Sequence, residues 1–186
     1  SMKYLFGTDQ YGRDIFSRMV YGTKYTISMG LIAASISAVI GIFLGSVTGY
    51  YGGKMDNFIM RAVDIFMTLP NILLALVITA SFGPGFFNTM IAVGIAGSPA
   101  MTRVTRAAVM GVRNQEFIEA AISNNASDMR IIWRYVLPNA IAPIIVQYTM
   151  FVAQAILIGS SLSFLGLGLQ PPAPEWGSML SAEKAY

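Results

Sequence analysis

The chain has 186 residues, of which 55% are hydrophobic and only 11% are charged, and its formal net charge is +3. Soluble domains carry about 25% charged residues, so lipid is expected to surround much of this chain. Cysteine and histidine are absent, which argues against disulfide bonds, a metal site and histidine-based acid–base catalysis. No basic run or basic–aromatic stripe is present, so we expect no nucleic acid partner.

Residues 1–24 predict a lead-in segment at the membrane interface. An apolar face at helical spacing is formed there by Ile15, Phe16, Met19 and Val20. The charged side chains lie largely on the other faces, which is typical of a helix lying between lipid and water. We therefore expect a separate interfacial helix before the first span.

Long runs without charge locate the membrane spans, at residues 25–53, 65–102 and 135–174. About 20 apolar residues cross the hydrocarbon core of a bilayer, so the first run predicts one helix. The second run is divided by Gly83-Pro84-Gly85 and predicts two helices, and the third predicts one. The four predicted spans cover residues 26–50, 59–82, 87–108 and 139–168.

These spans predict an all-α polytopic transmembrane bundle over residues 25–168, with a polar segment at 111–137. Residues 169–186 are expected to form an extracytoplasmic loop and the start of a further helix. The loops after the first and third spans share one side and carry seven of the 12 basic residues: Lys54, Arg61, Arg103, Arg106, Arg113, Arg130 and Arg134. The positive-inside rule therefore predicts that this side is cytoplasmic, in a multi-pass protein of the cell membrane.

Small residues recur every fourth position along the first span, at Ala33, Ser37, Gly41, Gly45, Gly49 and Gly53. Such a stripe lets a second helix approach closely, so we expect a helix-packing surface.

Two proline sites interrupt the next spans, at Pro70-Asn71 and Ser98-Pro99. Proline kinks a helix, and a polar residue beside a kink could line a pathway through the membrane. The simpler interpretation, a tolerated kink whose polar groups bond neighbouring helices, is favoured.

The polar segment predicts two short helices joined by a turn. One apolar face comprises Phe117, Ile118, Ala121 and Ile122, and the other comprises Met129, Ile132, Trp133 and Val136. The intervening Ser, Asn and Asp side chains compete for backbone hydrogen bonds. Asn125 can end the first helix in the left-handed conformation, and Ser127 can cap the second. The expected result is a polar knuckle that faces away from the bundle.

Four groups of residues resemble one family of transporters. They are Gly7-Thr8-Asp9 with Gly12-Arg13-Asp14, Ser17-Arg18 and Tyr21-Gly22; Gly49-Tyr50-Tyr51-Gly52-Gly53 with Asp56; Glu119-Ala120-Ala121 with Ala126-Ser127-Asp128 and Leu137-Pro138-Asn139; and Ser163 to Gly168 with Gln170-Pro171-Pro172 and Pro174 to Gly177. In this order they resemble permease subunits of the dipeptide, oligopeptide and nickel type of binding-protein-dependent ABC importer, with the Glu-Ala-Ala signature.

The resemblance implies a type I importer permease fold and a coupling segment, residues 111–137, that contacts an ATPase. The coupling residues it implies are Glu119, Ala120, Ala121, Asn125, Ser127 and Asp128. It also implies a homologous permease partner, two ATPase subunits that hold ATP and Mg²⁺, an extracytoplasmic substrate-binding protein and membrane lipid. None of the four lysines lies in a phosphate-binding Gly-x-x-x-x-Gly-Lys-Ser/Thr loop, so we expect no enzyme activity and no cofactor in this chain.

The expected substrate is a peptide, with a nickel or metal-chelate importer as the alternative. An ion channel or secondary transporter is the alternative from another class, disfavoured because the spans hold almost no ionisable residue. The chain departs from the family at Asn125, where glycine is usual, and in its span number, where six are usual. We therefore expect a fragment that cannot transport alone, needs detergent or lipid, and self-associates through the small-residue stripe.

Overall fold

The computed structural model describes residues 4–170 and 172–183. Its helices are α1 (Ile15–Tyr51), α2 (Gly53–Met67), α3 (Asn71–Phe82), α4 (Phe86–Val112), α5 (Glu116–Ser123), α6 (Asp128–Ile131), the π-helix η1 (Ile132–Val136), α7 (Leu137–Phe164) and α8 (Trp176–Ala182). Those residues contain no β-strand and one isolated bridge, between Thr8 and Asp14. The predicted all-α fold is confirmed.

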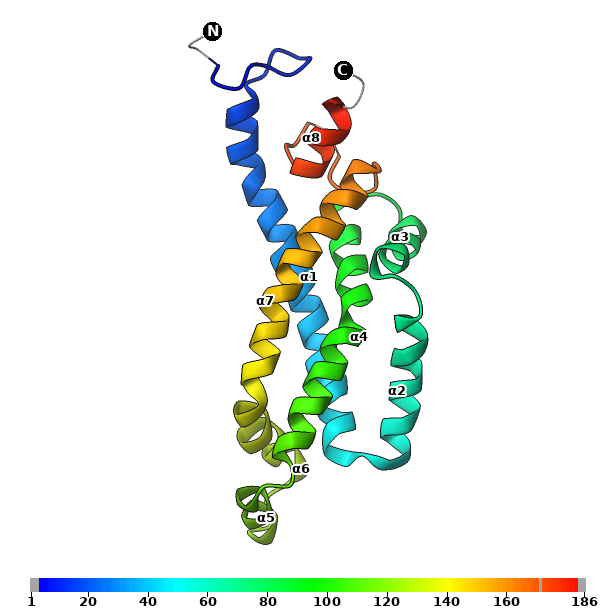
Figure 1. Ribbon diagram of the computed structural model, residues 1–186, viewed down its shortest axis with the longest axis vertical. Helices are drawn as coiled ribbons and strands as arrows, with labels where there is room; N and C mark the ends of the chain where they lie inside the picture. The colour runs from blue at the N-terminus through cyan, green and yellow to red at the C-terminus, as the bar shows by residue number, and fades with distance from the viewer. Residues whose placement is uncertain (1–3, 171, 184–186) are drawn as a thin grey trace.

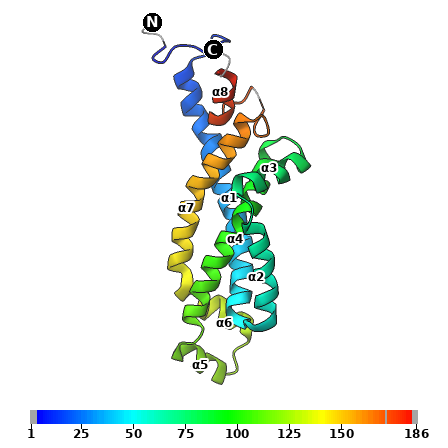
Figure 2. The same cartoon turned by 45° about the vertical axis from the view of Figure 1, so that its right-hand side comes forward.

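Helix α4 is the centre of the bundle. It contacts α1, α7, α3 and α2, and α1, α4 and α7 run side by side in both views (Figures 1 and 2). The α1–α2 turn, α5 and α6 lie at one end, the lower end in Figure 1, and the N-terminal loop and α8 lie at the opposite end. The two loops that were predicted to share one side therefore do so.

Fewer helices than predicted are both long and apolar enough to span a membrane. In the part of the chain that the structure describes, these are α1 and the continuous helix from Asp128 to Phe164, each of 37 residues. The bent pair of α2 and α3 gives a third if it is counted as one span. The predicted span over 87–108 corresponds to α4, whose polar residues lower its hydropathy. Because helices rather than lipid surround α4, it can bury four of them, at Thr89, Ser98, Thr102 and Thr105.

Helix α1 begins at Ile15 instead of residue 26. The Asp14 carboxylate accepts a hydrogen bond from the Ser17 N–H at 3.0 Å and so caps the helix. No break separates residues 15–24 from the rest of α1, so the prediction of a separate interfacial helix is wrong. Arg18 and Lys24 do not end the helix because both residue types have high helix propensity. The helix ends at Gly52, which has φ 65°, a conformation that glycine adopts without strain.

The two proline sites have different effects on the backbone. Pro70 separates α2 from α3, which are bent by 90° at this break, so the predicted span 59–82 is two helices. Pro99 lies inside the uninterrupted helix α4. It has no N–H for the Ile95 carbonyl, and the Ser98 hydroxyl donates to that carbonyl instead, at 2.8 Å. The serine therefore replaces the hydrogen bond that the proline removes.

Helix α6 continues through η1 into α7 without a break, so the predicted second short helix is the first part of a span. The π-helix ends at Val136, two residues before Pro138. A proline at this position cannot donate to the Arg134 carbonyl, and its ring crowds that carbonyl in an α-helix. The widened turns of η1 accommodate this conflict while the helix stays continuous.

Candidate functional site

The coupling segment turns at Asn125, which has φ 58°. The Asn125 N–H donates to the Ile122 carbonyl at 2.8 Å, and the Ala126 N–H donates to the Ala121 carbonyl at 3.2 Å. This pair of bonds is the Schellman arrangement that ends a helix at a left-handed residue. Asparagine in place of glycine keeps the turn because it tolerates this conformation. Ser127 occupies the N-cap position of α6, but its side chain makes no capping hydrogen bond, unlike the prediction.

Helix α5 buries a narrower face than predicted. Ile118 and Ala121 are buried, whereas Phe117 is 38% exposed and Ile122 is 55% exposed. The other predicted coupling residues, Glu119, Ala120, Asn125, Ser127 and Asp128, are all exposed. The structure thus gathers the predicted coupling residues into one projecting knuckle (Figure 1).

The second predicted apolar face is rotated. Met129 is 61% exposed and Trp133 is 54% exposed, while Ile131, Ile132 and Val136 are buried. The wide turns of η1 shift the buried positions away from regular α-helical spacing. Phe117, Ile122, Met129 and Trp133 therefore leave four large apolar side chains exposed on this segment.

The buried side of the coupling segment is fixed to the bundle. Ile118, Ile131 and Val136 belong to one hydrophobic cluster with Val109 of α4 and Ile144 of α7. A pocket of about 290 Å³ lies between α5 and the α6–η1 stretch, lined by Phe117, Ala120, Ala121, Asn124, Ala126, Arg130 and Tyr135. The segment therefore has a rigid base and a shaped surface that projects beyond the bundle.

The small-residue stripe lies against α4. Ala33, Ser37, Gly41, Gly45 and Gly49 are all buried. A Cβ added at Gly45 would lie 2.7 Å from the Thr102 carbonyl oxygen, and one at Gly49 would lie 2.9 Å from the Arg106 carbonyl oxygen. The two backbones are thus too close for any side chain between them. Gly53 does not belong to this contact, because it begins α2 and an added Cβ would meet nothing within 4 Å.

A cavity of about 350 Å³ lies between α2 and the pair α1 and α4. Ser98 and Pro99 line it, together with apolar side chains that include Leu44, Phe58 and Phe66. Pro70 and Asn71 are not among its lining residues. The structure therefore brings one of the two predicted kink sites to a cavity and leaves the other at the α2–α3 break.

Helix α2 is held to α4 by two ion pairs. The Arg106 guanidinium donates from Nε and Nη2 to the two Asp56 carboxylate oxygens, each at 2.6 Å. About two turns further along α2, on the exposed side, Asp64 pairs with Arg103. Apart from Asp56, α2 buries one residue, Val63, so polar contacts dominate its attachment.

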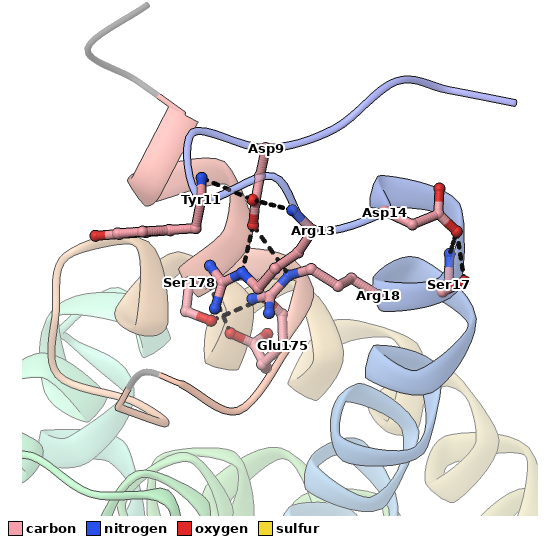
Figure 3. Close-up of polar contacts among 8 residues, drawn as sticks. All are labelled: Asp9, Tyr11, Arg13, Asp14, Ser17, Arg18, Glu175 and Ser178. Atoms are coloured by element: carbon pink, nitrogen blue, oxygen red, sulfur yellow. Dashed lines mark hydrogen bonds and ion pairs between the residues drawn. The ribbon is translucent and has the colours of Figure 1, made fainter. Parts of the chain in front are cut away.

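A polar cluster that the sequence reasoning missed fixes the N-terminal loop (Figure 3). The Asp9 carboxylate accepts hydrogen bonds from the N–H groups of Tyr11 and Arg13, both at 2.9 Å, and from Arg13 Nε at 2.7 Å. Arg18 Nε lies 3.6 Å away. Burial raises the pKa of Asp9, but the hydrogen bonds from Arg13 and Tyr11 outweigh it and leave the pKa below its usual value. The signal available in the sequence was Asp9 itself, because an Asp side chain often accepts a hydrogen bond from the N–H group two residues later, which is an Asx-turn.

Glu175 fixes α8 at the same end. Its side chain is buried and accepts hydrogen bonds from the Gly177 and Ser178 N–H groups, at 3.0 and 2.9 Å, and from the Ser160 hydroxyl at 3.1 Å. The Trp176 indole N–H donates to the Met19 carbonyl of α1 at 3.1 Å. Residues 157 positions apart therefore close this end of the bundle.

Comparison with known proteins finds permeases of peptide transport systems. The chain is 44% identical over 184 residues to the di/tripeptide transport system permease protein DppC of Pseudomonas aeruginosa, covering 99% of this chain and 61% of that protein. It is 44% identical over 186 residues to the dipeptide permease DppC of Alkalihalophilus pseudofirmus and 45% identical over 185 residues to the glutathione permease GsiD of Escherichia coli. Each match covers 100% of this chain and 61% of the relative, so the chain spans about three fifths of their length.

Solved structures support the fold. A chain of the inward-facing MetNI methionine ABC transporter superposes with a TM-score of 0.74 at 20% sequence identity, over 90% of this chain and 81% of that one. Residues 41–186 match the family model described as the binding-protein-dependent transport system inner membrane component. The chain belongs to this family of inner membrane components of binding-protein-dependent transport systems.

Proposed function

We propose that this chain is part of a permease subunit of an ABC importer for short peptides, driven by separate ATPase subunits that dock on the coupling segment. The observation that carries the proposal is the projecting knuckle around Asn125 with its exposed apolar side chains. These lie among Glu116, Glu119, Asp128 and Arg130. An apolar patch with a charged surround is typical of a protein–protein contact.

The geometry supports docking on a water-soluble partner rather than on lipid. The knuckle extends past the end of the long helices (Figure 2), and its turn carries polar side chains from Ser123 to Asp128. Its base is buried in the hydrophobic cluster with α4 and α7. A force on the knuckle would therefore reach the spans without a flexible joint between them.

The named relatives favour a short peptide as substrate. Their names specify dipeptides, di- and tripeptides and glutathione, which is itself a tripeptide. These names favour peptide transport over nickel or metal-chelate transport, and membership of the family of binding-protein-dependent transport systems favours an importer permease over an ion channel or secondary transporter. The proposed complex contains a second, homologous permease, two ATPase subunits and an extracytoplasmic binding protein, in the cell membrane.

The test uses the intact importer, with this chain in its native membrane complex. Uptake of a labelled dipeptide into proteoliposomes should require ATP and the binding protein, and unlabelled tripeptide should compete better than nickel ions. ATP-independent ion current, or uptake of nickel without peptide competition, would contradict the proposal.

A pair of variants tests the docking surface itself. Ile122→Glu places a charge on the exposed apolar patch of α5 and should reduce recovery of the ATPase subunits with the purified permease. Met55→Glu is the matched control, because Met55 is 46% exposed at the same end of the bundle but outside the coupling segment. Equal ATPase recovery with both variants would show that the patch is not part of the docking surface.

A further inference from the structure

Both ends of the coupling knuckle are tied to the last turn of α1. Arg113, directly after α4, donates from Nη1 to the carbonyl oxygens of Gly49 and Tyr50, each at 3.1 Å. Directly after the Asn125 turn, Asp128 accepts a hydrogen bond from the Tyr50 hydroxyl at 3.2 Å. Residues 114–127 thus form a loop whose two ends meet at Gly49 and Tyr50.

The hydrogen bonds from Arg113 satisfy backbone carbonyl groups at the C-terminal end of α1. The last carbonyl groups of an α-helix have no partner within the helix, and Gly49 and Tyr50 lie in the final turn of α1. A cation at this end also interacts favourably with the helix dipole. Arg113 therefore caps α1 while it belongs to the end of α4.

The helix that receives both contacts is itself rigidly held. Gly45 and Gly49 place the lower half of α1 directly against the backbone of α4. The Tyr50 side chain packs against the hydrophobic cluster that contains Ile118 and Ile131 of the coupling segment. The clamp formed by Tyr50, Arg113 and Asp128 therefore joins the knuckle to the most tightly packed helix pair of the bundle.

We propose that Tyr50 and Arg113 are positioning residues, which hold the coupling knuckle in a fixed orientation to α1 so that displacement of α5 moves α1. This inference rests on the proposed function, because it concerns the efficiency with which an ATPase movement becomes a movement of the spans. Tyr50 acts through Asp128, and Arg113 acts through the end of α1. Neither has to touch the ATPase or the substrate.

The experiment measures peptide transported per ATP hydrolysed by the intact importer in proteoliposomes. Tyr50→Phe removes only the hydroxyl, and this ratio should fall about three- to tenfold, as expected for the loss of one solvent-exposed hydrogen bond of ordinary strength. Asp128→Ala should lower the ratio at least as much, because Asp128 also lies in the charged surround of the docking patch, and adding Tyr50→Phe to Asp128→Ala should lower the ratio no further. Arg113→Met should lower the ratio, and Arg113→Lys should restore part of it.

Tyr148→Phe is the matched control. Its hydroxyl lies 3.2 Å from the Ser35 hydroxyl and also joins another helix, α7, to α1, but neither hydroxyl belongs to the coupling segment. This variant should keep the wild-type ratio even if its thermal stability falls as much as that of Tyr50→Phe. Equal losses of the ratio in both tyrosine variants would make the role of Tyr50 merely structural and overturn the inference.

Different results would contradict the clamp and the proposed function. A wild-type importer that transports peptide with ATP, together with a normal ratio in Tyr50→Phe and Arg113→Met, overturns the clamp alone. Absence of ATP-dependent uptake by the wild-type complex overturns the proposed function, and the clamp with it.

Discussion

Replacing Gly45 with alanine should push α1 and α4 apart. An added Cβ would lie 2.6 Å from the Thr105 Cβ, 2.7 Å from the Thr102 carbonyl oxygen and 2.9 Å from the Arg106 nitrogen. Two of these three atoms belong to the backbone and cannot rotate away. Overpacking of this kind costs about 1–3 kcal/mol, and the gain in helix propensity from glycine to alanine offsets about 0.5–1 kcal/mol of it.

Gly111→Ala provides the control, since Gly111 is also helical but an added Cβ there meets nothing within 4 Å. It keeps the propensity gain without the packing cost, so the two variants should differ by the whole cost of about 1–3 kcal/mol. On the scaling for domains of this size, that difference is about 2–12 °C in the melting temperature.

The assay is thermal unfolding followed by far-ultraviolet circular dichroism, in one detergent and at one heating rate. Gly45→Ala should melt below the wild type and Gly111→Ala at or above it, and Gly45→Leu should melt lower than Gly45→Ala. If Gly45→Ala melts together with Gly111→Ala, the close contact of α1 and α4 does not limit stability and the reasoning is refuted.

Three further outcomes are expected. Glu119→Lys should reduce ATPase recovery or peptide uptake by the intact importer while membrane insertion stays normal; normal recovery together with normal uptake would remove Glu119 from the docking surface. Asn125→Gly should keep the melting temperature and the uptake rate, whereas Asn125→Val should lower both, because a left-handed conformation costs an ordinary residue about 1–2 kcal/mol; equal behaviour of the two variants would argue against the strained turn. The lowered pKa of Asp9 means that its carboxylate stabilises the fold above its unfolded pKa and that this contribution disappears as the pH falls through the folded value. Between pH 7 and pH 3 the melting temperature of the wild type should therefore fall further than that of Asp9→Asn, and parallel curves would contradict the role of the cluster.

Features set by local chemistry could be predicted from the sequence. The spacing of Gly41, Gly45 and Gly49 places them on one helix face wherever that helix packs, and the burial of all three follows from that face. The left-handed turn at Asn125 needs only the conformational preferences of a short polar stretch. Neither inference depends on which residue of the chain lies opposite.

Features set by partners distant in the sequence could not be predicted. The hydroxyl of Tyr50 meets a carboxylate 78 positions later, at Asp128, and no periodicity encodes that pairing. Met129 and Trp133 were predicted to be buried on the second apolar face, and that prediction failed for a different reason. It relied on regular α-helical spacing, which η1 interrupts. The span predicted over residues 87–108 corresponds to α4, but charge-free runs could not show that other helices surround it, because hydropathy cannot distinguish a helix surrounded by other helices from one surrounded by lipid.

The bundle contains two parts that are held by different forces. α1, α4 and the coupling segment are joined by backbone contact at the glycine stripe, by the hydrophobic cluster and by the bonds of Arg113 and Tyr50. α2 is joined mainly by the ion pairs of Asp56 and Asp64, with a cavity of about 350 Å³ behind it. Close packing resists small displacements because each one opens a void or a clash, whereas the side chains of an ion pair can follow a movement of several tenths of an ångström. A displacement that enters at the knuckle would therefore move α1 and α4 as one body, and the cavity beside α2 is the place where the bundle has room to take it up.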